Sequence, residues 1–330
     1  MQRMAKVLRQ MKTPCLFMTM GTSLKIWNPD TVVSVPATIE CEDKYKGVWL
    51  VLNTQKLIDL FDMSYLDRRW VLSGASPFGG GVVIQSFGHF KAFRVSVGLE
   101  AMPDLVVGDD GEFPLSELLP LVPMASLDDS RSKLCGVHID AKRENIVATD
   151  GHRLVLKGVS GLKNRSVTVP TKLLKIAKAL GAENIGWSGD TAYARHDGFS
   201  VVSRCPDSDF PQYNRLIPST HNYLKPTVVD VGTGFGTRVA EQFKSAADVV
   251  FADGVKTKAP TLFYTEEGKW SATKGAHPVV EVNARYYRDM LKALYAMGDK
   301  KRLTVEVVDE HGAVIFKSGE ATGIVMPTRL

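Results

Sequence analysis

The sequence predicts an α+β protein built from three similar modules, each combining helices with short antiparallel strands. Two observations support this fold class. A strand–helix junction recurs three times at nearly equal intervals, and many short apolar stretches end at Gly, Pro or Asn turn signals. At 330 residues, the chain is too long for one ordinary hydrophobic core. With 44% hydrophobic and 23% charged residues, the composition is that of a folded globular protein.

Each recurring junction consists of an alternating apolar strand, then Asn or Pro, then an amphipathic helix. The helix starts at Asn53, Pro170 and Asn283 are roughly 115 residues apart. Asn accepts hydrogen bonds from the first backbone N–H groups of a helix, and Pro at a helix start loses no bond. The junctions cover residues 51–61, 167–180 and 280–294. They predict three domains, at residues 1–108, 109–220 and 221–330.

Each module also contains a second candidate helix before its junction. The first spans Met4–Met11, and the third spans residues 238–249. The second lies near residues 115–127, where Pro120 and Pro123 predict a short or kinked helix. The acid-free first 29 residues could pass for a transit peptide, but they contain a single serine and lead directly into strand-like sequence. We interpret them as part of the fold.

The cysteines and the hydropathy exclude several classes of protein. The four cysteines lie far apart, without the paired spacing of a zinc site, so we expect no metal and no disulfide framework. We expect no other cofactor. No apolar run approaches the ~18 residues of a membrane span. These features favour a reducing cytoplasm. The cysteines are Cys15, Cys41, Cys135 and Cys205.

Two of the junction helices carry a row of cations opposite their apolar face. Such a row is usually a solvated surface, but here Asp289 is the one acid interleaved, whereas exposed helices tend to mix charges. The pattern favours a track for a polyanion, bound through phosphates because no base-reading motif occurs. The first helix breaks the pattern with Asp59 and Asp62. The cations are Lys172, Lys175, Lys178, Arg285, Arg288 and Lys292.

Three further segments are distinctive. Residues 148–154 form an Asp-Gly hairpin turn between apolar strands, because Gly allows positive φ. Residues 209–218 are expected to be an extended linker, and residues 323–330 a final strand that stops at Pro327. His152 in the turn could be a catalytic base, but no nucleophile or orienting carboxylate stands at a recognisable spacing.

Together these segments resemble the bacterial beta sliding clamp, the beta subunit of DNA polymerase III. That family has a Thr-Asp-Gly-His-Arg-Leu turn, a Phe-Pro linker and a Val-Met-Pro-Met-Arg-Leu terminus, in this order. The resemblance covers the chain from about Leu16 to Leu330. It implies a non-catalytic, homodimeric, head-to-tail ring of six domains that encircles duplex DNA. It also implies partners that carry short peptide motifs: the replicative polymerase, the clamp loader and repair proteins.

The resemblance also implies specific sites. Arg131 and Lys133 match a loop that touches DNA, and Phe93 would face Val249 and Val250 across the dimer interface. The peptide pocket would combine apolar residues with Arg and His at its rim. Its residues would be Leu134, Thr149, Gly151, His152, Arg153, Leu154, Pro211, Arg215, Leu216, Ile324, Met326, Pro327, Thr328 and Arg329.

The chain departs from the family in several ways. The first domain lacks the family's first strand, and the net charge is +5 where the family is commonly acidic. Gln212, Asn214 and Thr328 replace the usual residues, so the preferred peptide motif can differ. An alternative is a clamp-like protein that does not encircle DNA and captures host peptide motifs. A nucleotide-handling enzyme is a third reading, but Gly79-Gly80-Gly81 lacks the Lys-Ser/Thr of a P-loop.

Overall fold

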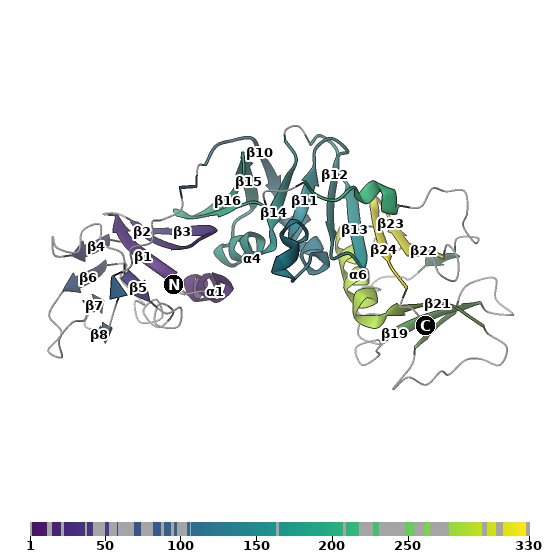
Figure 1. Cartoon of the computed structure of the whole chain (residues 1–330), viewed down its shortest axis with the longest axis horizontal. Helices are drawn as coiled ribbons and strands as arrows, with labels where there is room; N and C mark the ends of the chain where they lie inside the picture. The colour runs from purple at the N-terminus through teal and green to yellow at the C-terminus, as the bar shows by residue number, and fades with distance from the viewer. Residues whose placement is uncertain are drawn as a thin grey trace. The chain divides into compact units, whose positions relative to one another are not determined.

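The computed structural model divides the chain into two compact units (Figure 1). Unit 1 comprises residues 1–116 and 169–206, and unit 2 comprises residues 117–168 and 207–330. The residues that the structure describes are 2–11, 15–20, 23–36, 38–41, 50–52, 58, 69–73, 82–86, 89–93, 96–97, 104–105, 107–162, 165–206, 209–217, 227–230, 248–253, 261–264, 277–298, 302–307 and 313–327.

Unit 1 contains a nine-stranded sheet in which segments from the first and second predicted domains pair. Val201 pairs with Val33 across the join, and the buried hydroxyls of Thr31 and Ser203 are 3.0 Å apart. The strands, in spatial order, are β10 (Gly111–Pro114), β15 (Asn184–Ser188), β16 (Thr191–His196), β17 (Phe199–Arg204), β3 (Thr31–Pro36), β2 (Ser23–Asn28), β1 (Cys15–Met20), β5 (Leu50–Leu52) and β9 (Ser96–Val97).

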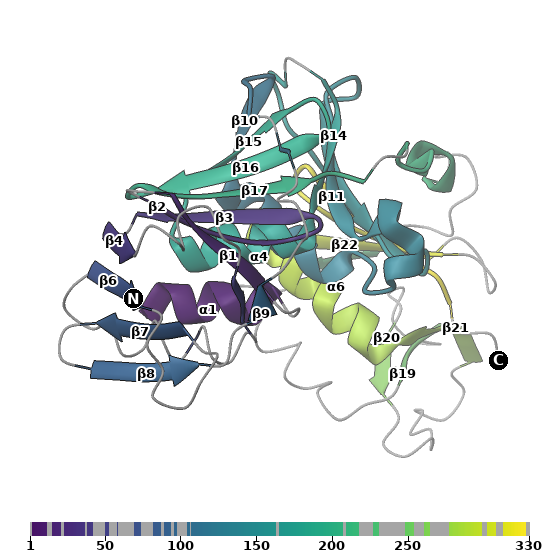
Figure 2. The ribbon, with the colours of Figure 1, turned by 60° about the vertical axis from the view of Figure 1, so that its left-hand side comes forward.

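Two helices of unit 1 lie side by side (Figure 2). They are α1 (Gln2–Met11) and α4 (Thr171–Leu180). Helix α4 packs on β16 and β17 and ends at Gly181, whose φ of 84° is the left-handed conformation that glycine adopts at little cost. A second sheet of unit 1 has the order β4 (Thr38–Cys41), β6 (Arg69–Ser73), β7 (Val82–Ser86) and β8 (His89–Phe93).

Unit 2 is organised around an eight-stranded sheet and helix α6 (Ala284–Met297). A three-stranded sheet has the order β20 (Thr261–Tyr264), β19 (Asp248–Asp253) and β21 (His277–Asn283). The eight strands, in spatial order, are β14 (Val167–Pro170), β11 (Gly136–Asp140), β12 (Asn145–Thr149), β13 (Arg153–Gly158), β24 (Ala321–Val325), β23 (Val314–Ser318), β22 (Arg302–Val307) and β18 (Thr227–Asp230).

Helix α6 forms the core of unit 2 with the strands beside it. Met290, Leu291 and Leu294 are fully buried, and Gly323 of β24 approaches so closely that a Cβ there would overlap the Met290 side chain. The helix also packs on η2 (Leu119–Met124), a 3₁₀ helix that continues α3 (Leu115–Leu118). The described residues also form the short helices η3 (Asp129–Leu134) and η4 (Tyr213–Leu216).

The structure confirms the α+β class and most of the predicted elements. The second and third junctions form β14–α4 and β21–α6, and Asn283 Oδ1 accepts from the backbone N of Arg285 and Tyr286. Helix α1 is present, and the region after residue 115 is short and changes to 3₁₀ geometry, as its prolines predict.

One predicted helix is wrong at its end, and other predictions lie outside the described residues. The last two residues of the helix expected at 238–249 lie instead in strand β19, where residues 248 and 249 pair with β21. Residues 238–247 are not described. Ile58 is the one described residue in the helical part of the first junction, and the glycines at 79–81 are not described. The three domain boundaries stay a prediction. Within the described part of the chain, no helix is long and apolar enough to cross a membrane.

Candidate functional site

The β12–β13 turn is held rigidly by its own side chains. Gly151 adopts φ 93°, as the Asp-Gly pattern predicts. Asp150 Oδ1 accepts from the backbone N of His152 and of Arg153, at 2.9 and 3.0 Å. Thr149 Oγ1 donates to the Arg153 carbonyl at 2.7 Å. The polar groups of the tight turn are therefore satisfied locally.

The C-terminal strand folds back beside this turn, as the resemblance implies. Strand β24 pairs with β13, so that Leu154 lies opposite Ile324 and Arg153 lies opposite Val325. Beyond the strand, the Met326 backbone N donates to the His152 carbonyl at 2.9 Å. The turn and the tail therefore join, although they are far apart in sequence. Thr328 and Arg329 lie outside the described residues.

The linker reaches the same part of unit 2, but it is not extended throughout. Residues 213–216 form the 3₁₀ turn η4, and the Tyr213 side chain is 3% exposed. Tyr213 packs in a core cluster with Val147, Leu154, Ile315 and Ile324, where Leu156 and the neighbouring Phe210 also contribute. Hairpin, linker and tail are thus anchored on one shared core.

A stacked pair fastens the start of the linker. The rings of His138 and Phe210 are parallel within 2° and 4.6 Å apart, and His138 Nδ1 lies 3.0 Å from Thr168 Oγ1. Burial lowers the pKa of His138 to about 4, although Asp140 opposes this shift. The ring is therefore neutral at neutral pH.

Three apolar side chains of the linker and tail are exposed. Leu216 is 56% exposed, Met326 47% and Ile217 37%. We call these three residues the apolar surface. Exposed apolar side chains on neighbouring segments are typical of interaction sites. Other residues of the predicted pocket are buried: Leu134, Thr149, Leu154 and Ile324 are 9% exposed or less. Pro211 is half-buried, while Gly151, His152 and Arg215 are exposed.

Arg153 lies beneath the surface rather than at a rim. Its side chain is 5% exposed and contacts groups from three elements. Nε is 3.0 Å from Asp150 Oδ2, and Nη1 is 2.8 Å from Asp289 Oδ2 on α6. Nη2 donates to the Pro123 carbonyl of η2 at 2.7 Å. The sequence pattern missed Asp289 as a partner, because Asp289 stands 136 positions away.

The predicted basic residues are accessible to different degrees. Lys172, Lys175 and Lys178 are exposed on α4, opposite the buried Leu173, Leu174 and Ala177. On α6, Arg285 and Lys292 are exposed and Arg288 is half-buried. Arg131 and Lys133 are exposed on η3, where Arg131 Nη1 also donates to the Asp150 carbonyl at 3.4 Å. Their contact with DNA stays a prediction.

The residues predicted for the dimer interface lie on two strands. Phe93 ends β8, the terminal strand of its four-stranded sheet. Val249 and Val250 lie on β19, between β20 and β21. Their side chains are outside the described part of the structure, and the interface remains a prediction.

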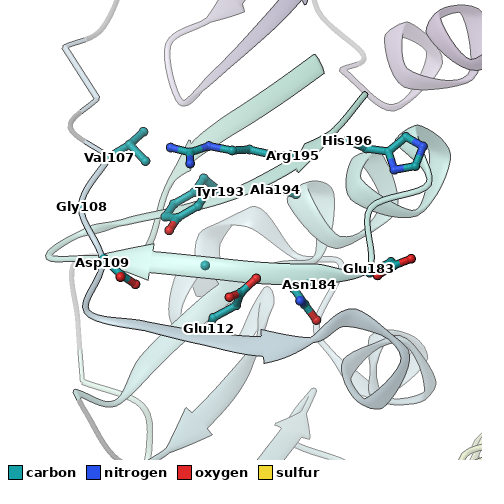
Figure 3. A pocket seen from close by; sticks show the side chains of 11 residues that line it. Val107, Gly108, Asp109, Glu112, Glu183, Asn184, Tyr193, Ala194, Arg195 and His196 are labelled. Carbon is teal, nitrogen blue, oxygen red and sulfur yellow. The ribbon is translucent and has the colours of Figure 1, made fainter. Parts of the chain in front are cut away.

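Unit 1 has an open polar cleft that no sequence motif predicted (Figure 3). Its volume is about 840 Å³. Arg195 lies over the Tyr193 ring at 4.9 Å, and Figure 3 shows both above Glu112 in the view. The acids Asp109, Glu112 and Glu183 come from two distant segments, which explains why the sequence did not reveal them. Among the described residues, no group of three or more His, Cys, Asp or Glu could hold a metal ion.

By sequence, the chain matches no family model and no curated protein. By structure, it is similar over its whole length to sliding clamps. The DNA polymerase III beta chain of Streptococcus pneumoniae has a TM-score of 0.69 at 15% identity, covering 99% of this chain and 97% of that chain. The Caulobacter crescentus pol III beta has a TM-score of 0.68 at 18% identity, covering 100% of this chain and 99% of that chain. The Helicobacter pylori beta clamp bound to a DNA ligase peptide has a TM-score of 0.64 at 14% identity, covering 99% of this chain and 98% of that chain.

These similarities define the fold. It is the fold of a sliding clamp. More specifically, it is the fold of the bacterial DNA polymerase III beta subunit, which the hairpin, linker and terminus indicated from the sequence. At 11–19% identity, the chain is a divergent example of this fold.

Proposed function

We propose that this protein is a divergent bacterial-type DNA sliding clamp, a processivity factor without catalytic chemistry of its own. Its homodimer would encircle duplex DNA in the cytoplasm. It would bind short peptide motifs of a replicative polymerase, a clamp loader and repair proteins. The full-length similarity to solved beta clamps supports this proposal.

The observation that carries the proposal is the meeting of hairpin, linker and tail in unit 2. The Met326 backbone N donates a hydrogen bond to the His152 carbonyl. Leu216 ends the 3₁₀ turn η4 that begins at Tyr213. Tyr213 is buried in the same core cluster as Leu154 and Ile324. The apolar surface therefore stands on a fixed base. An apolar anchor of a peptide can bury against such a surface without ordering it first, which keeps the entropic cost of binding low.

The same surface provides polar groups at its edge. Arg215 and His152 are exposed and can contact the backbone or polar side chains of a bound peptide. The complex of the Helicobacter pylori clamp with a DNA ligase peptide supports a peptide of this kind as the ligand. Gln212 and Asn214, which differ from the usual family residues, are both exposed on the linker. Through these two residues, the peptide motif that this chain prefers would differ from the motif that the family usually binds.

The basic helices support the DNA part of the proposal. The exposed lysines of α4 come from unit 1 and the exposed Arg285 and Lys292 of α6 from unit 2, so each unit contributes one cationic helix face. Binding through phosphates releases counterions and does not depend on base sequence. Such contacts suit a protein that must slide.

Retention on circular DNA tests the proposal directly. The protein is loaded onto a nicked circular plasmid with a bacterial clamp loader, and its retention is measured by gel filtration before and after the plasmid is linearised. A ring that is linked topologically should remain on the circle and leave the linear form. In solution, light scattering should give twice the chain mass of 36.2 kDa. A monomer that binds clamp motifs and is never retained would overturn the ring and favour the alternative, a non-encircling protein that captures such motifs.

A further inference from the structure

The buried guanidinium of Arg153 connects the hairpin to α6. It forms ion pairs with Asp150 in the turn and Asp289 in the helix, and its third contact is the Pro123 carbonyl. Its carbon Cζ lies 4.5 Å from the centroid of the Tyr286 ring, within the range of a cation–π contact. All of these residues belong to unit 2.

Tyr286 also contacts the neighbouring residue of the hairpin. The rings of His152 and Tyr286 are stacked, with centroids 6.0 Å apart and planes 21° apart. Tyr286 therefore touches both His152 and Arg153. Asp289 lies three residues further along α6, on the same face of the helix. One face of α6 thus holds two successive residues of the turn.

The hairpin does not need these contacts to form its strands. The ladders of β13 with β12 and β24 pair the backbone on both sides, and Asp150 and Thr149 satisfy the turn. What α6 adds is the orientation of the His152 and Arg153 side chains. A charged group buried to this degree is costly unless it is paired, so the Arg153 side chain is confined to the geometry of its three acceptors.

We propose that Tyr286 and Asp289 are positioning residues for the apolar surface, a role that rests on the proposed function. Their contacts orient the His152 and Arg153 side chains at the corner of the hairpin, where His152 is exposed. The His152 carbonyl then holds the backbone of Met326, which is the exposed apolar residue of the tail. The helix that carries exposed Arg285 and Lys292 therefore also sets the geometry of the peptide surface.

The affinity for a peptide tests this role. The probe is a fluorescently labelled synthetic peptide with the clamp-binding motif of a bacterial replicative polymerase, measured by anisotropy. Asp289→Asn and Tyr286→Leu should each weaken binding roughly tenfold, as expected for residues coupled to a binding hot spot. Tyr286→Phe keeps the ring and should retain the affinity within about twofold. Glu320→Gln, which removes an exposed acid at the β23–β24 turn, should bind like the wild type.

A second readout separates positioning from simple loss of stability. The His152 ring protons are observed by NMR without peptide. Their shifts should move in Tyr286→Leu and stay near the wild-type values in Tyr286→Phe and Glu320→Gln, because the neighbouring ring current is lost only in the first. Wild-type affinity in folded Asp289→Asn and Tyr286→Leu, or unmoved His152 signals in Tyr286→Leu, would overturn the positioning role while leaving the proposed function in place. A wild-type protein that binds no clamp peptide would overturn the proposed function itself, and with it the peptide role of α6.

Discussion

The Tyr213 hydroxyl donates a hydrogen bond of 3.0 Å to Asp140 Oδ2, although the two residues stand 73 positions apart. Asn145 Nδ2 donates to the same hydroxyl at 3.4 Å. Burial, with a further contribution from the bond to Asp140, raises the pKa of Tyr213 to about 12, so the phenol stays protonated and can donate. A segment with the sequence of a linker is in this way docked on the sheet.

Removing this hydroxyl should loosen the docked linker. Tyr213→Phe leaves Asp140 with its bond from Arg143 but takes away a buried donor. We expect the free energy of unfolding to fall by about 1–2 kcal/mol, measured by urea denaturation. Tyr193→Phe, which removes the same group in the open cleft of unit 1, is the matched control and should cost less. Equal stability of the two variants would contradict the role of this bond.

Acid should destabilise the protein through His138. Its pKa is about 4 in the folded chain, against an ordinary value of 6.5, so the unfolded chain binds more protons between these values. The stability that depends on neutral His138 is fully present above about pH 6.5 and is lost as the pH falls towards 4. The loss in the free energy of unfolding reaches about 3 kcal/mol.

Urea denaturation at several pH values between 7 and 4 measures this loss. His138→Phe keeps a ring to stack on Phe210 and should flatten the dependence in this window. Asp140, whose pKa is held below its usual value by bonds from Arg143 and Tyr213 against the effect of burial, loses its contribution only at lower pH. An unchanged slope in His138→Phe would show that other groups cause the acid sensitivity.

The apolar surface should carry the peptide affinity. Met326→Ala and Leu216→Ala should each weaken binding of the polymerase peptide by about 2 kcal/mol, or roughly thirtyfold, with little change in thermal stability because both side chains are exposed. Leu127→Ala, at a 76% exposed position outside the surface, is the control. Unaltered affinity in both test variants would remove the site assignment.

Leu154 is not suited to the same test. At 2% exposure it belongs to the core cluster, and Leu154→Ala should cost about 2–5 kcal/mol of folding stability. The resemblance placed Leu154 among the residues that line the predicted peptide pocket, where truncation of a side chain would cost little stability. Its burial changes that expectation, and a thermal melt of the variant checks it.

Reversing the basic helix faces should weaken retention on circular DNA. The pair Lys175→Glu and Lys178→Glu removes two predicted phosphate contacts of α4, so the dependence of binding on salt should become shallower, with the largest loss at low salt. Arg195→Glu with Arg204→Glu makes the same charge change at exposed positions on strands β16 and β17, outside the helical rows of cations, and should have a smaller effect. If both pairs change retention on circular DNA equally, the rows of cations on the helices are ordinary solvated surfaces. The corresponding pair on α6 is Arg288 and Lys292.

The predicted interface can be tested by mass. Phe93→Ala combined with Val249→Glu should yield monomers in light scattering, because a ring interface needs its apolar anchors. Leu127→Ala should leave the dimer intact. Circular dichroism checks that the doubly substituted chain stays folded, since Val249 is paired within a sheet. A folded double variant that remains a dimer would refute this placement.

The sequence by itself determined the features that depend on near neighbours. Asn283 caps α6 with its own carboxamide, Gly151 provides the positive φ of the hairpin, and the lysines of α4 follow from its helical period. The order of the hairpin, linker and terminal segments was enough to indicate the clamp fold, even though the sequence identity to solved clamps is as low as 11%.

Only the tertiary structure decided which distant groups meet. It buried Arg153 against Asp289 and turned part of the linker into a 3₁₀ helix that begins at Tyr213. It also paired Val201 with Val33, so that two predicted domains share one sheet. No local pattern specifies these pairs, because an Arg or Tyr has the same preferences beside any acid. The choice is made by the whole chain, since burial is favourable only where every polar group that it encloses finds a partner.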